Sequence, residues 1–365
     1  MFPYLLRKLL LAIPAIWLLG TLVFLLSRLL PGSFAEERLL NQEGGFYSKG
    51  SQSSREEALR QYQERTGQNL PVFYFGLTSP NKNTDQAQHI SLFPQLSWHG
   101  ADNQYHRWLK GVFTGDLGTS YRTGLPVLDM IWKSIGNTFW LLLASMLVTL
   151  ILAMELSILM ARERLRWLRS LVLPILFFID SIPMLVLSLL LLVLLANPDF
   201  LQLFPVYGMG YYVPGQLSFW QELGQRLQYM ALPHLALVLV NLPYITNQVY
   251  SSLQAALQAA YTRTARAKGL PERLVIRRHA LRNALLPLIT IVSDFLPALV
   301  SGSILVETIF AIPGIGRLLV ESVLARDYPV LVAIVLVVLV VRMVAYTLAD
   351  IAYALADPRL KPKLA

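Results

Sequence analysis

The sequence predicts an all-α membrane protein with six transmembrane helices. Long and mostly uncharged apolar runs recur along its 365 residues, and a run of about 20 apolar residues crosses roughly 30 Å of hydrocarbon. Of all residues, 55% are hydrophobic and only 15% are charged, whereas about a quarter of the residues in an ordinary soluble domain are charged. The six candidate spans are residues 9–30, 136–160, 171–196, 231–250, 284–306 and 330–353.

The first span follows a basic start at Arg7 and Lys8. Its apolar run is longer than the core of about 7 to 15 residues in a typical signal peptide. Residues 1–30 are therefore predicted to form a retained first transmembrane helix. The fourth span is the weakest prediction, because Asn241, Pro243 and Asn247 interrupt it.

The polar stretch 31–135 separates the first two spans. It is long enough to be translocated whatever its charge, so we predict an extracytoplasmic insertion that ends in an entrance segment. Within it, the capping-box spacing of Ser54 and Glu57 predicts a helix that stops at Gly67. Residues 78–103 show no periodicity and are predicted to be loop.

The net charge of +9 follows the predicted topology. If the amino terminus is cytoplasmic, the cytoplasmic segments are residues 1–8, 162–169, 251–283 and 357–365, and these carry the Arg and Lys clusters. The short opposite loops hold only Arg226, Arg317 and Arg326. The positive-inside rule therefore predicts that both termini are cytoplasmic, with residues 136–356 as the membrane core and 357–365 as a tail. Nucleic-acid binding is not needed to explain the basic balance.

Several chemistries are excluded or disfavoured. The chain has no cysteine, which excludes disulfides and thiolate metal sites. It also lacks a Gly-x-x-x-x-Gly-Lys-Ser/Thr loop, so no ATP site is predicted. His89, His99 and His106 match no metal-ligand spacing, and no metal site is predicted.

Charged residues inside the predicted spans cost at least roughly 2.5 to 3.5 kcal/mol at the bilayer centre. Asp180, Asp294 and Arg342 are therefore expected to face the bundle interior or a water-filled path. A pair between Asp294 and Arg342 is conceivable. A structural tie between helices and a role in translocation both remain open.

The basic loop before the fifth span carries the most informative motif. It reads Tyr261-Thr-Arg-Thr-Ala-Arg-Ala-Lys-Gly-Leu270, followed by Arg277-Arg-His-Ala-Leu-Arg-Asn-Ala-Leu-Leu-Pro287. It resembles the EAA loop of binding-protein-dependent ABC importer permeases, in the form found in the dipeptide and oligopeptide branch. That resemblance implies a short helix that docks on an ATPase. The implied coupling residues are Arg263, Thr264, Ala265, Arg266, Ala267, Lys268, Gly269, Arg278, His279, Arg282, Asn283 and Pro287.

Two further segments resemble the same family. The first is Gly115-Asp-Leu-Gly-Thr-Ser120, placed in the family at the outer membrane face, although tight structural turns explain it more readily than direct substrate contact. The second is Val306-Glu-Thr-Ile-Phe-Ala-Ile-Pro-Gly-Ile-Gly-Arg-Leu-Leu319, which in the family forms a bent helical hairpin rather than an ordinary amphipathic helix. The implied entrance residues are Gly115, Asp116, Gly118, Ser120, Glu307, Pro313, Gly314 and Gly316.

The resemblance implies a six-helix fold of the type I ABC importer kind in a bacterial inner membrane. Its expected partners are membrane lipid, a second homologous permease subunit, two ATPase subunits that bind ATP and Mg, an extracytoplasmic substrate-binding protein and a peptide substrate. No cofactor is expected on this chain. The alternatives are a permease for nickel, glutathione or another small solute, a membrane-embedded enzyme using the insertion, and a channel or secondary carrier.

Overall fold

The structure is a computed structural model, and it describes residues 2–29, 57, 60–61, 63–64, 66–78, 95–206, 208, 218–285 and 303–356. The chain divides into two compact units. The first unit comprises residues 1–12, 133–320 and 338–365, and the second comprises residues 13–132 and 321–337. Four helices run from one unit into the other, namely α1 (Phe2–Leu29), α5 (Val127–Ala161), α14 (Ile315–Leu324) and α15 (Tyr328–Ala356).

Among the described residues, four helices are long and apolar enough to cross a membrane: α1, α5, α8 (Phe219–Gln258) and α15. They contain the predicted spans 136–160, 231–250 and 330–353, and residues 9–29 of the predicted first span. Helix α8 begins at a capping box, in which the Gln221 side chain accepts from the Ser218 backbone N–H at 2.9 Å. It continues through Asn241 and Pro243 without a break, so the polar residues that weakened this prediction do not end the helix.

The predicted third span, residues 171–196, is not one continuous helix. It consists of two helices, α6 (Arg166–Asp180) and α7 (Met184–Ala196), bent by 102° at the intervening residues. Pro183 stands at the break; it lacks a backbone N–H and restricts the residue before it. Mean hydropathy does not detect such a bend, because both helices are apolar.

The predicted fifth span, 284–306, falls mostly outside the described residues. It is flanked by α11 (Leu281–Ala284) and α13 (Ile304–Ile309). The total of six spans therefore remains a prediction.

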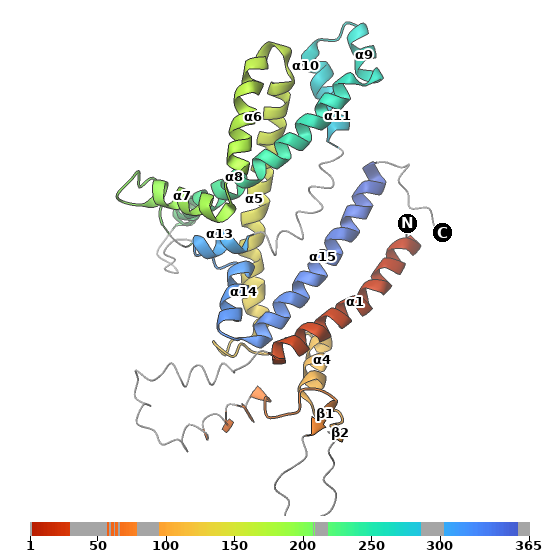
Figure 1. Ribbon diagram of the computed structural model, residues 1–365, viewed down its shortest axis with the longest axis vertical. Coiled ribbons are helices and arrows are strands. Elements are labelled where there is room, and N and C mark those ends of the chain that lie inside the picture. Colours follow the sequence, from red (N-terminus) through yellow and green to blue (C-terminus); the bar gives the residue numbers. More distant parts are fainter. Residues whose placement is uncertain are drawn as a thin grey trace, which may run out of the picture. The chain divides into compact units, whose positions relative to one another are not determined.

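The core of the first unit forms where α6 and α7 pack on α8 and α13 packs on α7 (Figure 1). Buried side chains from α5, α7, α8 and α13 meet there, including Leu141, Leu191, Leu232 and Val306. Large apolar side chains also point outward: Trp140 is 66% exposed and Phe178 is 69% exposed. Such outward faces suit contact with lipid or with another apolar subunit.

The second unit contains the polar stretch after α1. Strands β1 (Phe75–Thr78) and β2 (Gln95–Trp98) pair antiparallel, with Phe75 opposite Trp98 (Figure 1). The loop predicted for 78–103 is therefore wrong at Thr78 and at Gln95–Trp98, which are strand, whereas residues 99–103 are neither helix nor strand. Residues 79–94, with His89, lie outside the described residues. The described positions from Glu57 to Thr66 are helical, and the chain turns at Gly67 with φ 68°.

Helix α4 (Gln104–Thr114) anchors this unit. Its N-cap is Asn103, whose side-chain oxygen accepts from the His106 N–H at 2.7 Å. Tyr105 is buried among aromatic rings, with Phe24 at 5.5 Å and Phe73 at 5.0 Å between centroids. Its hydroxyl lies 2.8 Å from the Thr21 hydroxyl. These contacts fix α4 against α1.

Candidate functional site

The predicted coupling loop is a compact set of short helices at the end of α8 (Figure 1). They are α9 (Ala260–Ala267), α10 (Glu272–Leu274), the π-helical turn η3 (Val275–Ala280) and α11. Helix α8 stops where Ala259 takes extended backbone angles, φ −69° and ψ 155°. The fully buried Thr262 places its hydroxyl within 3.0 Å of the carbonyls of Ala256 and Leu257. This contact holds the first turn of α9 against the end of α8.

Helix α9 ends in a Schellman motif. The N–H of Gly269 donates to the Arg266 carbonyl at 2.9 Å, and the N–H of Leu270 donates to the Ala265 carbonyl at 3.4 Å. Gly269 has φ 76°, a left-handed conformation that favours glycine. A Cβ added there would meet no atom within 4 Å. The glycine is therefore required by the turn and not by crowding within this chain.

Arg266 ties α9 to α10. Its guanidinium donates to both carboxylate oxygens of Glu272, at 3.0 and 2.7 Å, and also to the Leu257 carbonyl at 3.2 Å. The hydrogen bond from Arg266 lowers the pKa of Glu272, and the same bond raises the pKa of Arg266. Glu272 was not among the predicted site residues, because its pairing depends on the turn between the two helices.

The coupling segment packs on α5 as well as on α8. Ile276 and Ala280 from η3 are buried with Ile158 of α5 and Leu253 of α8. Beside this contact, the Arg277 guanidinium donates to both oxygens of Glu155, at 2.9 and 2.8 Å. Glu155 lies inside the predicted second span and was not among the predicted site residues. A charged residue near the end of an apolar run was the available signal.

The opposite face of the segment is exposed and cationic. Ala265 is buried, His279 is half-buried, and Thr264, Arg266, Ala267 and Gly269 are exposed. The exposed cations that form no ion pair with another described residue are Arg263, Lys268, Arg273, Arg278 and Arg282. Asn283 lies in α11, and Pro287 lies outside the described residues. The segment thus has one face fixed to α5 and α8 and one positive face without partners in the described chain.

A second cluster surrounds the fully buried Glu307 of α13. One carboxylate oxygen accepts from the hydroxyls of Thr138 and Ser303, both at 2.7 Å, and the other accepts from the Arg317 N–H at 3.0 Å. The Thr138 hydroxyl in turn accepts from the Ile315 N–H at 2.9 Å. This carboxylate therefore joins α5, α13 and α14 into one hairpin assembly.

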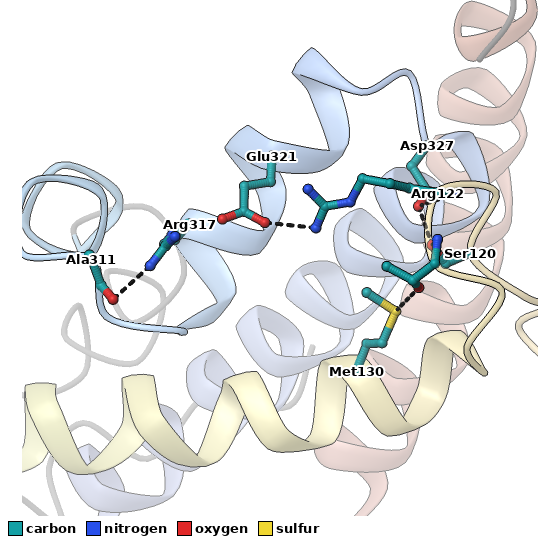
Figure 2. A network of polar contacts seen from close by, with 8 residues as sticks. Ser120, Arg122, Met130, Ala311, Arg317, Glu321 and Asp327 are labelled. Atoms are coloured by element: carbon teal, nitrogen blue, oxygen red, sulfur yellow. Dashed lines mark hydrogen bonds and ion pairs between the residues drawn. The ribbon is translucent and has the colours of Figure 1, made fainter. Parts of the chain in front are cut away.

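Two glycines leave the space that the Glu307 carboxylate and the neighbouring turn need. A Cβ added at Gly314 would lie 2.3 Å from the Glu307 carboxyl carbon, and one at Gly316 would lie 2.8 Å from the Ile304 Cα. The Pro313 carbonyl accepts from the Asn137 side chain at 2.9 Å. Arg317 donates to the Ala311 carbonyl at 2.6 Å (Figure 2). The predicted Pro-Gly-x-Gly bend is thus a turn closed around Glu307.

A third cluster lies in the second unit and is centred on Asp327, which is 2% exposed. Ser120 donates a short hydrogen bond to its carboxylate, and the Tyr121 N–H donates to the same group at 2.9 Å. Arg122 pairs with Glu321 at 2.8 Å (Figure 2). Asp327 was not among the predicted site residues.

Two glycines before Ser120 form turns in the chain segment that leads to this cluster. Gly115 caps α4 with φ 79°, and Gly118 has φ 82°. The Asp116 carboxylate accepts from the Gly118 N–H at 2.9 Å, which is a local turn bond. Gly115, Asp116 and Gly118 are exposed, and Ser120 is buried.

The polar residues predicted inside the spans are not brought together among the described residues. Asp180 is exposed at the end of α6, beside the break before α7. Arg342 is exposed and places its guanidinium over the ring of Tyr346, 5.5 Å from the centroid. Asp294 lies outside the described residues, so its pairing with Arg342 remains a prediction. A polar contact that was not predicted joins α5 and α8: the Ser145 hydroxyl lies 2.7 Å from His234 Nδ1.

The remaining histidines of the insertion make local contacts. His106 Nδ1 lies 2.9 Å from the Tyr74 hydroxyl, and His99 Nε2 lies 3.1 Å from the Ser97 hydroxyl. Within the described ranges, no three metal-ligating side chains gather into a group that could hold an ion.

Comparison with known proteins identifies a transport component. The family described as "Binding-protein-dependent transport system inner membrane component" matches residues 153–362. The oligopeptide transport system permease protein AppB of Bacillus subtilis is 35% identical over 259 residues, which are 71% of this chain and 80% of that protein. The dipeptide transport system permease protein DppB of Alkalihalophilus pseudofirmus is 30% identical over 377 residues, covering 99% of this chain and all of the relative.

A third relative is the probable D,D-dipeptide transport system permease protein DdpB of Escherichia coli, 34% identical over 70% of this chain and 79% of its own length. These matches confirm the predicted resemblance and the prediction of a transport subunit rather than an enzyme. The chain therefore belongs to the family of binding-protein-dependent transport system inner membrane components.

Proposed function

We propose that this chain forms part of the translocation path for dipeptides or oligopeptides in an ATP-driven importer. The relatives with these names extend over most or all of the chain. The observation that supports the mechanism best is the coupling segment, which has a buried face on α5 and α8 and an exposed cationic face.

In this proposal, the exposed face of α9 and η3 docks on a separate ATPase. Arg263 and Arg278 pair there with acidic side chains or with helix carbonyls, as arginine forks do at interfaces. ATP and Mg bind to the ATPase and not to this chain. Closure of the ATPase then moves the coupling segment, and Arg277 and the buried core carry that movement to α5 and α8.

The proposed architecture is the six-span arrangement of a type I importer. Residues 1–30 form the first span, 31–135 form an extracytoplasmic insertion with the entrance segment, and 136–356 form the permease core with its coupling loop at 251–283. Both termini, including the tail 357–365, are cytoplasmic. A second homologous permease lies beside this chain, two ATPase subunits bind below, and a substrate-binding protein delivers peptide outside.

The clusters at Glu307 and Asp327 have a supporting role in this proposal. Both fix loops next to predicted entrance residues through buried carboxylates. Backbone polar groups in such bends must be satisfied by protein or water if they lie at membrane depth, and the hydrogen bonds to these carboxylates provide that satisfaction. We assign them to holding the outer pathway in shape.

Copurification of the ATPase tests the docking proposal. The full chain is expressed with its partner permease and ATPase subunits, and the amount of ATPase retained is measured for wild type and for Arg263→Glu with Arg278→Glu. Both arginines are exposed, so their reversal spares the packed face, and we expect roughly a tenfold loss of retained ATPase.

The matched control is Arg226→Glu, which reverses an exposed arginine on α8 that pairs only with Glu222 among the described residues. It should retain the ATPase as wild type does. Full retention by the double variant, at normal membrane level, would contradict docking through this face.

A further inference from the structure

A cavity of about 350 Å³ lies within the second unit, between α1, α4, the turn at 116–121 and the first turns of α15. This volume falls in the range of small-molecule binding sites, about 300 to 1,000 Å³. Neither the coupling segment nor the Glu307 cluster contributes to its lining. The cavity does include Asp116 and Gly118, two residues of the predicted entrance segment.

Its walls are aromatic and held in place. The rings of Phe24 and Trp108 stack at 5.0 Å, and Trp108 lies 5.5 Å from Tyr105. The Arg28 guanidinium lies over the rings of Phe24 at 5.2 Å and Tyr328 at 5.8 Å. Cation–π contacts of this kind fix the position of an arginine without using its hydrogen-bond donors.

Two polar atoms of lining residues are buried and unsatisfied. The Nε of Arg28 has no hydrogen-bond partner among the described residues, and neither has the side-chain oxygen of Gln104. The amide nitrogen of Gln104 donates to the carbonyls of Gln68 and Leu70, at 3.1 and 2.7 Å, which fixes the oxygen as the free end. Buried polar atoms without partners are rare and call for an explanation.

The charges lining the cavity balance. Arg28 and Arg107 are cationic, and Glu64 and Asp116 are anionic. A ligand with an anionic acceptor and a cationic donor would satisfy the orphan donor, the orphan acceptor and both signs of charge in the lining. A zwitterion of small size fits this description.

We propose that this cavity binds the zwitterionic backbone of a short peptide, with the carboxylate at Arg28 and the ammonium group at Gln104 and the lining carboxylates of Glu64 and Asp116. The inference rests on the proposed function, and it assigns part of the substrate recognition to this chain itself. Arg28 offers a planar fork suited to a carboxylate. The aromatic walls suit side chains of varied shape, because they supply apolar contact without hydrogen-bond demands.

A phospholipid headgroup with a phosphate and an amine shares some of this chemistry. Glycerophosphoethanolamine, which carries such a headgroup without acyl chains, therefore forms one arm of the titration below.

Binding to the wild-type protein provides the first test. The full chain with its partner permease and ATPases, without the binding protein, is titrated calorimetrically with dialanine, dialanine amide, N-acetyl-dialanine and glycerophosphoethanolamine. We expect dialanine to bind and each of the two blocked peptides to bind at least roughly tenfold more weakly, because a buried charge loses its partner. Equal binding of all three peptides would overturn the proposal, as would binding of glycerophosphoethanolamine alone.

Variants of Arg28 provide the second test. Arg28→Gln should weaken dialanine binding roughly tenfold and Arg28→Lys should weaken it less, since lysine keeps the charge and loses the fork. Arg226→Gln, an exposed arginine on α8, should bind as wild type. Unchanged binding by Arg28→Gln would overturn the proposal. If that variant does not assemble, the blocked peptides on wild type decide the question alone.

Uptake by the complete importer separates this inference from the proposed function. ATP-driven dialanine uptake by wild type, together with the same binding of dialanine by wild type and Arg28→Gln, would overturn the cavity site and leave the importer intact. Absence of uptake for any short peptide by wild type would overturn the proposed function itself.

Discussion

At the scale of single residues, two buried carboxylates organise bends of the chain. Glu307 accepts hydrogen bonds from two side-chain hydroxyls and one backbone N–H. Asp327 accepts hydrogen bonds from the Ser120 hydroxyl and from the Tyr121 N–H. A buried charge is costly unless it is hydrogen-bonded, and both carboxylates are satisfied in this way. Each of them therefore acts as a local organiser whose loss leaves several donors without a partner.

Gly314→Ala tests the packing around Glu307. The new Cβ would lie within 2.5 Å of all three carboxyl atoms, so the hairpin must shift, at a cost of about 1 to 3 kcal/mol. The thermal unfolding midpoint of the purified complex should fall. Gly224→Ala is the control, because its Cβ meets no atom within 4 Å and it lies inside α8; it should leave the midpoint unchanged or raise it. Equal midpoints for Gly314→Ala and wild type would refute this packing.

Asp327→Asn tests the turn at residues 120–122. The substitution replaces one acceptor oxygen by a donor that faces Ser120 and removes the charge that strengthens the remaining hydrogen bonds. We expect a loss of about 1 to 3 kcal/mol in local stability, seen as faster hydrogen exchange of residues 118–126 by mass spectrometry. Asp199→Asn, at an exposed turn after α7, should leave that exchange unchanged. Exchange in Asp327→Asn as slow as in wild type would remove Asp327 from this role.

At the scale of elements, the coupling segment is a helical unit closed by ion pairs. Arg266 joins α9 to α10, and Arg277 joins η3 to α5. Both pairs are partly exposed, so each contributes only about 0.2 to 1 kcal/mol to stability. Their main role is therefore to hold the coupling segment in position, and they add little to the overall free energy of unfolding.

The Arg266–Glu272 pair predicts a pH dependence. The folded pKa of Glu272 is lowered, so its contribution is complete above the ordinary glutamate value of 4.5 and is lost as the pH falls through the lowered pKa. Hydrogen exchange of residues 260–275, corrected for intrinsic rates, should show protection that weakens below about pH 4.5. In Glu272→Gln this step should be absent, and in Glu222→Gln it should persist. A step of the same size in Glu272→Gln would assign the titration to another group.

A charge exchange tests the contact between η3 and α5. Arg277→Glu places two carboxylates together and should lower ATP-driven uptake roughly fivefold, whereas Arg277→Glu combined with Glu155→Arg should recover much of the loss. Uptake is measured at matched membrane levels of the complex. Failure of the double variant to exceed the single variant would show that the pair does not couple these elements.

At the scale of the whole molecule, hydropathy predicted the helices but not their bends. The runs within α1, α5, α8 and α15 are apolar along their length, and each is a long helix. The third apolar run, residues 171–196, contains a 102° bend. Mean hydropathy over a window does not reveal this bend, because Pro183 is only one of the residues averaged. The hairpin of β1 and β2 was missed since each strand has only four residues, too few for an alternating pattern to stand out.

The sequence motifs identified segments of the candidate sites, and the structure shows which residues pair with them. Gly269 and Glu307 could be named from the sequence because they lie in recognisable segments. Thr138 could not be named, since it bonds to Glu307 across 169 positions. Glu155 and Asp327 were missed for the same reason: their partners are distant in sequence, and pairing across such distances cannot be inferred from one chain alone.

In the proposed mechanism, this chain imports peptide only through an external ATPase docked on the segment that turns at Gly269. The variants Gly269→Asn and Gly269→Val separate the turn from side-chain size, because asparagine tolerates φ 76° and a β-branched residue does not. A Cβ at position 269 would have no atom of this chain within 4 Å, so neither substitution creates a clash there.

The most direct test measures ATP-driven uptake of labelled dialanine into proteoliposomes that contain this chain, its partner permease and the ATPases, with binding protein supplied at the opposite face. We predict uptake by wild type and Gly269→Asn, roughly a tenfold loss in Gly269→Val at equal membrane level, and no uptake when the ATPases are omitted. Uptake of the same size without the ATPases would contradict the account.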